Sequence, residues 1–107
     1  MDLAGKTIVI TGGARGLGAA MARRLAGAGS RLALVDLDES ALRATAEECR
    51  AAGSPQAQGY IANVAKEDEV EALFDNIVAD FGEIHGLVNN AGIIRDCLLY
   101  TSDAADE

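Results

Sequence analysis

The chain has 107 residues, of which 50% are hydrophobic and 24% are charged, and this is the composition of a folded globular domain rather than of a disordered segment. Its net charge of −8 argues against nucleic acid or an anionic membrane as a partner. No apolar run approaches the roughly 18–20 residues that span a bilayer, and the two cysteines, Cys49 and Cys97, form neither a metal-binding spacing nor a disulfide framework. We therefore expect a cytoplasmic protein without a metal site.

The first third of the chain alternates strand and helix. Lys6–Thr11 is a short β-branched run that is typical of a buried strand, and Arg31–Asp36 is a second such run. Between them, residues 16–29 have helical spacing, and Gly29 is expected to end the helix. The three largest apolar side chains of this helix are four residues apart and so share one face: Leu17, Met21 and Leu25.

A second helix is expected to begin near Asp38, because a short carboxylate is a good N-cap, and to end at Gly53. Its apolar positions fall on one stripe, formed by Leu42, Thr45 or Ala46, and Cys49. The next segment, Ala57–Val64, predicts a third strand from a weaker pattern.

The most regular helical pattern in the chain ends at Gly82. Apolar residues recur there at i, i+3, i+4, i+7, i+8 and i+11, and acidic residues in the first turns complement the helix dipole. The apolar positions are Val70, Leu73, Phe74, Ile77, Val78 and Phe81, and the acids are Glu67, Asp68, Glu69 and Glu71. A fourth strand follows at Ile84–Asn89, and its composition predicts burial on both faces.

Strands that are joined by helical crossovers must run parallel, and right-handed crossovers place helices on both faces of the sheet. The predicted fold is therefore α/β, with the order β-α-β-α-β-α-β. This is the N-terminal half of a doubly wound parallel sheet.

The turn between the first strand and the first helix is rich in glycine: "TGGARGLG", Thr11 to Gly18. The amino end of a helix carries about half a positive charge and free N–H groups, so it suits a phosphate. Gly12 allows a sharp turn, Gly16 leaves room for a pyrophosphate, and Gly18 lets the helix lie close to the sheet. Because a strand precedes the motif and a helix follows it, we predict a dinucleotide-binding turn rather than a loop that merely needs flexibility.

Asp36 ends the second strand, eighteen residues after Gly18. A carboxylate there can accept hydrogen bonds from both hydroxyls of an adenosine ribose, and it would repel a 2′-phosphate. Arg15 acts in the opposite sense, because a cation beside the phosphates could accept a 2′-phosphate. We expect Asp36 to dominate, and we predict NAD rather than NADP as the cofactor.

These residues resemble the short-chain dehydrogenase/reductase family. Its marks are Thr-Gly-x-x-x-Gly-x-Gly after the first strand and Asn-Asn-Ala-Gly after the fourth, and Thr11–Gly18 and Asn89–Gly92 match them in that order. The three-residue gap between Gly12 and Gly16 fits the main branch rather than the epimerase-like one. "AGIIRD" most resembles the 3-oxoacyl-carrier-protein reductase group, from which Asp36 departs because that group usually prefers NADPH.

The resemblance implies a Rossmann fold and a set of cofactor-binding residues. The pyrophosphate would lie on the backbone around Gly12, Arg15, Gly16 and Leu17, beside Gly18. The adenine would lie between Asn63, where the family often has Asp, and Val64. The nicotinamide-side ribose would contact Asn90, Ala91 and Gly92, while Asn89 would brace the sheet.

The family's chemistry is hydride transfer between nicotinamide and an alcohol or carbonyl carbon, with a tyrosine as proton donor or acceptor and a lysine four residues on that lowers its pKa. A serine and an asparagine assist. Neither Tyr60 nor Tyr100 is followed by such a lysine, and Lys66 is the last lysine in the chain. We therefore predict no catalytic residue within these 107 residues. For His85, at a strand start, a structural or solvent-facing role is expected.

The last eleven residues, "CLLYTSDAADE", resemble the in-frame translation of a transposase sequencing adapter, where the family has a leucine-rich step into another helix. We predict that residues 1–96 are a partial NAD(P)-binding domain and that residues 97–107 are a non-native tail. A natural short protein with an acidic tail is the alternative.

The leading hypothesis for function is a cofactor-binding fragment of an NAD-dependent short-chain oxidoreductase. The parent would be a homo-oligomer acting on a small-molecule alcohol/ketone pair, and the fragment itself would be inactive. The alternative is a stand-alone nucleotide-binding or regulatory module, and glycine spacing disfavours an epimerase or dehydratase. An apolar edge at the fourth strand predicts aggregation, marginal stability and weak or no NAD binding.

Overall fold

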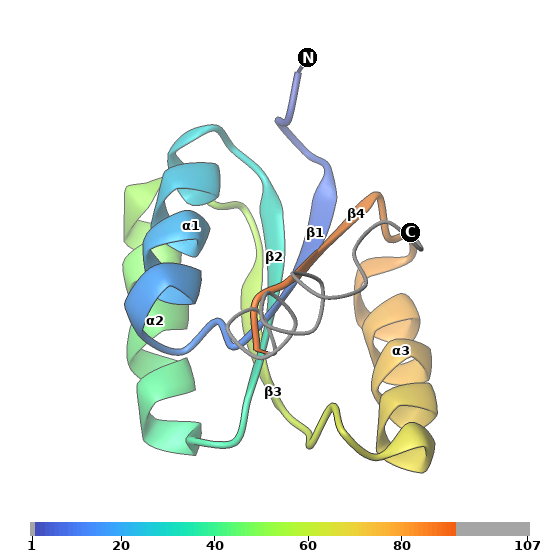
Figure 1. Cartoon of the computed structure of the whole chain (residues 1–107). Coiled ribbons are helices and arrows are strands. Elements are labelled where there is room, and N and C mark those ends of the chain that lie inside the picture. The colour runs from blue at the N-terminus through green and yellow to red at the C-terminus, as the bar shows by residue number, and fades with distance from the viewer. Residues whose placement is uncertain (1, 92–107) are drawn as a thin grey trace, which may run out of the picture.

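The computed structural model describes residues 2–91, which form four strands and three helices in strict alternation (Figure 1). They are β1 (Thr7–Thr11), α1 (Gly16–Gly27), β2 (Arg31–Asp36), α2 (Glu39–Ala52), β3 (Ala57–Ile61), α3 (Glu67–Phe81) and β4 (Gly86–Asn89). The sheet has the order β3-β2-β1-β4, and every neighbouring pair is parallel. The predicted α/β fold with a parallel sheet is confirmed.

Helices cover both faces of the sheet, with α1 and α2 on one side and α3 on the other (Figure 1). Because side chains alternate along a strand, Ile8 and Ile10 of β1 pack towards α1 and α2, while Val9 packs towards α3. All five residues of β1 are buried, as expected for a central strand with a helix on each face. All four strands run downwards in the view of Figure 1, so their carboxyl ends lie together at the lower end of the sheet.

The second and third helices follow the sequence pattern. α2 begins after Asp38, which accepts a hydrogen bond from Ala41 N, and ends at Gly53. Its buried stripe contains both of the residues left as alternatives, together with the other predicted positions: Leu42, Thr45, Ala46 and Cys49. In α3 the buried residues are Leu73, Ile77 and Phe81, whereas Val78 at the margin of the stripe is 47% exposed.

The large apolar residues of α1 are not the ones that pack deepest against the sheet. Leu17 is 58% exposed, and Met21 and Leu25 are only half-buried. The residues that pack on the sheet side are small: Gly18, Ala19, Ala22 and Ala26. Small side chains let the axis of α1 lie close to the sheet and to α2. The face of α1 that becomes buried is therefore the one that allows close packing, not the one with the largest apolar side chains.

The prediction that the fourth strand is buried on both faces is also wrong. β4 is shorter than Ile84–Asn89, and it pairs with β1 at one edge of the described sheet. Leu87 is 55% exposed, and Val88, on the other face, is half-buried against the α1/α2 side of the core. β3 is shorter than predicted too, so Asn63 and Val64 lie in the loop that follows it. No helix within residues 2–91 has the length and apolarity to cross a membrane.

Candidate functional site

A cleft of about 760 Å³ opens where the carboxyl ends of the strands meet. It lies at the place where open α/β sheets bind ligands, outside the carboxyl edge of the sheet. Seven of the predicted cofactor-binding residues line it: Gly12, Arg15, Asp36, Asn63, Val64, Asn90 and Ala91. Gly16, Leu17 and Gly18 lie in the adjoining turn and first helical turn rather than in the lining, and Gly92 lies outside the described residues.

Two glycines of the turn are required by close approach of the backbone. Gly12 has φ +65°, and a Cβ there would lie 2.9 Å from Asn90 Nδ2 and 3.0 Å from Ala91 Cα. A Cβ on Gly18 would lie 2.0 Å from the carbonyl oxygen of Gly12, so only glycine lets α1 start this close to the turn. Both positions agree with the steric reasons that the sequence suggested.

Gly16 has a different reason to be glycine. Its φ is +60°, a region that favours glycine, and a Cβ would meet no atom of the described residues within 4 Å. The space beside this backbone is therefore open. α1 starts there with Arg15 as its N-cap residue, without a side-chain capping bond from residues 2–91 and without an acidic residue in its first turn. By contrast, Asp38 caps α2, and α3 starts with three acids. The positive end of α1 is thus left uncompensated beside the open space.

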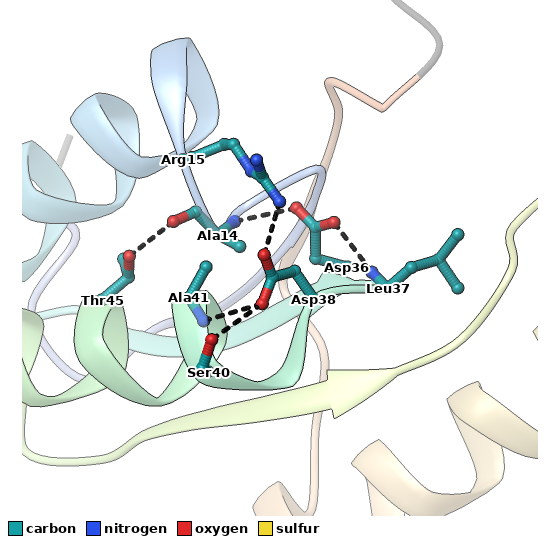
Figure 2. A network of polar contacts seen from close by, with 8 residues as sticks. All are labelled: Ala14, Arg15, Asp36, Leu37, Asp38, Ser40, Ala41 and Thr45. Carbon is teal, nitrogen blue, oxygen red and sulfur yellow. Dashed lines mark hydrogen bonds and ion pairs between the residues drawn. The ribbon is translucent and has the colours of Figure 1, made fainter.

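The turn is held in place by β2 and α2 (Figure 2). Gly13 N donates to the carbonyl of Val35 at 3.1 Å, and Ala14 N donates to Asp36 Oδ2 at 3.1 Å. From the other side, the buried hydroxyl of Thr45 donates to the carbonyl of Ala14 at 2.7 Å. Sequence reasoning missed this role of Thr45; a polar residue on an otherwise apolar stripe was the available signal.

The loop after β4 is joined to the end of β1. Thr11 Oγ1 donates to Asn89 Oδ1 at 3.0 Å and accepts from Ala91 N at 3.1 Å, while Asn90 Nδ2 donates to the carbonyl of Gly12 at 3.1 Å. Asn89 therefore braces the sheet, as the resemblance implied. The sequence marks Thr11 only as part of the glycine motif, yet its hydroxyl connects that motif to the Asn-Asn-Ala-Gly motif after β4.

Asp36 points towards the glycine turn. One carboxylate oxygen accepts from Ala14 N, and the other accepts from Leu37 N at 2.7 Å. Each carboxylate oxygen can accept about two hydrogen bonds, so both retain capacity towards the cleft. Asp36 thus orders the turn in addition to lining the cleft.

Arg15 leans over the loop between β2 and α2 and pairs with Asp38 rather than pointing into the turn (Figure 2). Its Nη2 lies 2.6 Å from Asp38 Oδ2. The hydrogen bonds from Ala41 N–H and from the Ser40 hydroxyl, more than the charge of Arg15, hold the pKa of the Asp38 carboxyl below its ordinary value. Sequence reasoning gave Asp38 a capping role only.

Asn63 shapes the loop after β3. Its Oδ1 accepts from Ala65 N at 2.9 Å, and its own N–H donates to Glu69 Oε1 at 2.8 Å. The side-chain oxygen therefore holds a local turn, which places Asn63 and Val64 at the cleft beside Phe74 of α3.

The tyrosine and histidine of the described residues lie away from the cleft. The Tyr60 hydroxyl donates to Asp80 Oδ2 at 2.6 Å, and burial together with this carboxylate raises the pKa of Tyr60 well above its usual range. His85 Nδ1 accepts from Thr7 N at 2.9 Å, at the opposite end of β1 from the cleft. The expected structural role of His85 is confirmed. Cys49 is fully buried, and burial raises the pKa of its thiol.

A parallel sheet with helices on both faces, and a glycine turn that leads into a helix with no side-chain cap from residues 2–91, define the class of Rossmann-type α/β proteins. Within that class the chain matches the model of the family described as short chain dehydrogenase over residues 6–106. The chain belongs to this family. The match runs across the predicted boundary at residue 96, which stays a prediction.

The chain is 37% identical over 99 residues to the 3-oxoacyl-(acyl-carrier-protein) reductase of Escherichia coli strain K12, covering 92% of this chain and 39% of that one. Among solved structures, a short chain dehydrogenase/reductase from Burkholderia phymatum in complex with NAD has a TM-score of 0.75 at 39% identity, covering 81% of this chain and 31% of that one. A metagenomic short-chain oxidoreductase in complex with NADP has a TM-score of 0.78 at 37% identity, covering 84% and 40%.

The chain spans between about a third and a half of the length of the curated relatives that it matches, from 35% to 53% for the first three.

Proposed function

We propose that the cleft binds the nicotinamide dinucleotide NAD. The observation that carries this proposal is the meeting, at one edge of the sheet, of an uncompensated helix amino end, an open space beside Gly16 and the carboxylate of Asp36. Phosphates suit the first two features, and a ribose diol suits the third. The residues proposed to hold the cofactor are Gly12, Arg15, Gly16, Leu17, Gly18, Asp36, Asn63, Val64, Asn90 and Ala91, with Gly92 outside the described residues.

The preference for NAD over NADP rests on Asp36. Both of its oxygens are oriented by backbone N–H groups, and their remaining capacity would accept ribose hydroxyls. A 2′-phosphate at the same place would be repelled by this carboxylate. Relatives of known structure are complexed with NAD in one case and NADP in another, so the family itself leaves both cofactors open.

We further propose that the whole protein is an oxidoreductase for an alcohol/ketone pair. A bound nicotinamide would supply or accept the hydride. The proton-transferring Tyr-x-x-x-Lys pair does not occur in the 107 residues, so this chain alone should turn nothing over. A 3-oxoacyl compound is the candidate substrate, supported by the "AGIIRD" stretch and by the similarity to the Escherichia coli reductase.

The test is an NMR titration of the ¹⁵N-labelled chain with NAD, with Asp36→Ala as the variant. Chemical-shift changes should fall on the turn from Gly12 to Gly18 and on the loops after β2 and β3. Asp36→Ala should weaken NAD and bring NADP to a similar affinity. If NAD affinity is unchanged in Asp36→Ala, or if the shifts map elsewhere, the assignment is wrong. Reduction of a ketone by NADH with this chain would overturn the proposed inactivity.

The genomic reading frame tests the proposed division of the chain. Codons continuing past Asp96 into a segment with Ser and Tyr-x-x-x-Lys are expected. A stop codon directly after Glu107 would instead favour a stand-alone nucleotide-binding module.

A further inference from the structure

Asp38 uses both of its carboxylate oxygens, each for a different part of the molecule (Figure 2). Oδ1 accepts from Ala41 N at 3.1 Å and from Ser40 Oγ at 3.1 Å, which fixes the carboxylate to the start of α2. Oδ2 is directed away from the helix and meets Arg15 Nη2 at 2.6 Å. The Arg15 guanidinium is therefore paired with a carboxylate whose position is fixed, because Asp38 is the N-cap of α2. If Arg15 turned towards a ligand in the cleft, it would lose this ion pair.

Arg15 is also the only cation among the described residues that line the cleft. A 2′-phosphate on an adenosine ribose held at Asp36 would need a cation there, since it brings about two negative charges to a carboxylate. Asp36 and Asp38 carry two negative charges against one positive charge on Arg15, so this corner of the cleft has a net charge of about −1.

From this geometry we propose that Asp38 is a positioning residue for cofactor specificity: by holding Arg15 over the start of α2, it withholds from a 2′-phosphate the cation that would otherwise receive it. The inference rests on the proposed binding of an adenine dinucleotide. Asp36 would discriminate against NADP by repelling the 2′-phosphate directly. Asp38 would add a second contribution to this discrimination, which acts through Arg15 and not through contact with the nucleotide.

The decisive variant is Asp38→Asn. Asparagine caps a helix as well as aspartate does, so the hydrogen bond from Ala41 N is kept while the charge that holds Arg15 is removed. The probes are 5′-AMP and adenosine 2′,5′-bisphosphate, which differ only in the 2′-phosphate. NMR titrations of the 107-residue chain at low ionic strength give both dissociation constants, even where they are millimolar. We expect Asp38→Asn to shift their ratio in favour of the bisphosphate by about two- to fivefold, the range of exposed ion pairs.

Two controls separate this mechanism from a change in overall charge. Glu39→Gln removes one negative charge from the adjacent residue, whose partner is Arg43 at 3.2 Å, and it leaves the pair of Arg15 and Asp38 intact. It should leave the ratio unchanged. In an Arg15→Gln background, Asp38→Asn should also leave the ratio unchanged, because the effect requires the guanidinium.

Each outcome decides the proposal. An unchanged ratio in Asp38→Asn overturns it, and so does an equal shift in Glu39→Gln. An equal shift in the Arg15→Gln background would mean that Asp38 repels the phosphate directly, which also overturns the positioning role. If neither probe shifts any signal of the wild-type chain, the proposed cofactor site itself fails. If 5′-AMP binds at the cleft with an unchanged ratio, only the role of Asp38 fails. A shift that shrinks as salt is added supports the ionic mechanism.

Discussion

Replacing Gly18 by alanine tests the closest backbone approach in the site. The added Cβ would lie 2.0 Å from the carbonyl oxygen of Gly12 and 2.7 Å from Asn90 Nδ2. Neither atom is the free end of a flexible side chain, because the carbonyl belongs to the turn and the amide is hydrogen-bonded to that carbonyl. The start of α1 must therefore move by about 1 Å from the turn to relieve the contact.

Such overpacking typically costs about 1–3 kcal/mol of unfolding free energy. For a domain of this size, each kcal/mol lowers the melting temperature by roughly 4–8 °C. The matched control is Gly27→Ala in the same helix, where a Cβ would meet no atom of the described residues within 4 Å. That substitution should stabilise the fold by about 0.4–1 kcal/mol, because alanine restricts the unfolded chain.

The assay is urea and thermal unfolding of wild type and both variants, followed by circular dichroism. A 5′-AMP titration by NMR follows for any variant that folds. The two substitutions add the same methyl group to one helix, so opposite signs isolate the contact with the turn. The reasoning is refuted if Gly18→Ala unfolds within about 0.5 kcal/mol of wild type, or if Gly27→Ala loses as much stability as Gly18→Ala.

Three further outcomes are expected. Thr45→Val should lower the free energy of unfolding in urea by about 1–3 kcal/mol, because it leaves the buried carbonyl of Ala14 without the Thr45 hydroxyl as donor. Thr45→Ser keeps a hydroxyl and should restore most of this loss. A valine variant as stable as wild type would contradict the prediction. The pKa of Asp38 is lowered in the folded state, so its stabilisation is present above the unfolded value of about 3.9 and is lost as the pH falls through the lower folded value. Thermal melts should therefore lose more stability below about pH 4 in wild type than in Asp38→Asn, and parallel curves would argue against it. Leu87→Lys should reduce concentration-dependent light scattering, because it places a charge on an exposed edge strand, whereas Val78→Lys on a helix surface should not; equal effects would remove the strand edge as the cause.

The sequence predicted those parts of the fold that depend on local pattern. α2 has its N-cap at Asp38, its end at Gly53 and its buried stripe where capping and periodicity place them. Both signals act within a few residues of chain, so no tertiary information is needed to find them. Gly12 and Gly18 were predictable for a related reason, since a turn from a strand directly into a helix leaves no room for side chains at these positions.

The faces of α1 and β4 were not predictable in the same way. Periodicity identifies residues that share a face, but it does not say which face has a protein surface to pack against. In α1 the buried residues Gly18, Ala22 and Ala26 have small side chains, so a hydrophobic pattern does not distinguish them from the rest of the helix. They are buried because small side chains allow α1 to pack closely against its neighbours. Leu17 and Leu87 are as apolar as core residues, and within the described part of the chain they have no such surface.

The pair of Arg15 and Asp38 is a third kind of feature. The two residues are 23 positions apart and meet because they follow adjacent parallel strands, which the fold prediction already placed side by side. Their proximity was thus implied, but the choice of partner was not. The long side chain of an arginine in the glycine turn can point towards a ligand or towards a carboxylate. Here the position of Asp38 at the α2 N-cap favours the carboxylate.

Hydrogen bonds to β2 and α2 order the glycine turn before any nucleotide binds. Gly13 N, Ala14 N and the carbonyl of Ala14 are all bonded to β2 or α2, so protein groups alone fix the turn. Its conformational entropy is then lost on folding and not on binding, which favours affinity. The N–H groups at the start of α1 have no such side-chain partner within residues 2–91. Stability and affinity are consequently separable in part at this site. Thr45 acts on the stability of the turn, and the open amino end of α1 acts on the affinity for a ligand. Asp36 takes part in both, because its carboxylate orders the turn and also lines the cleft.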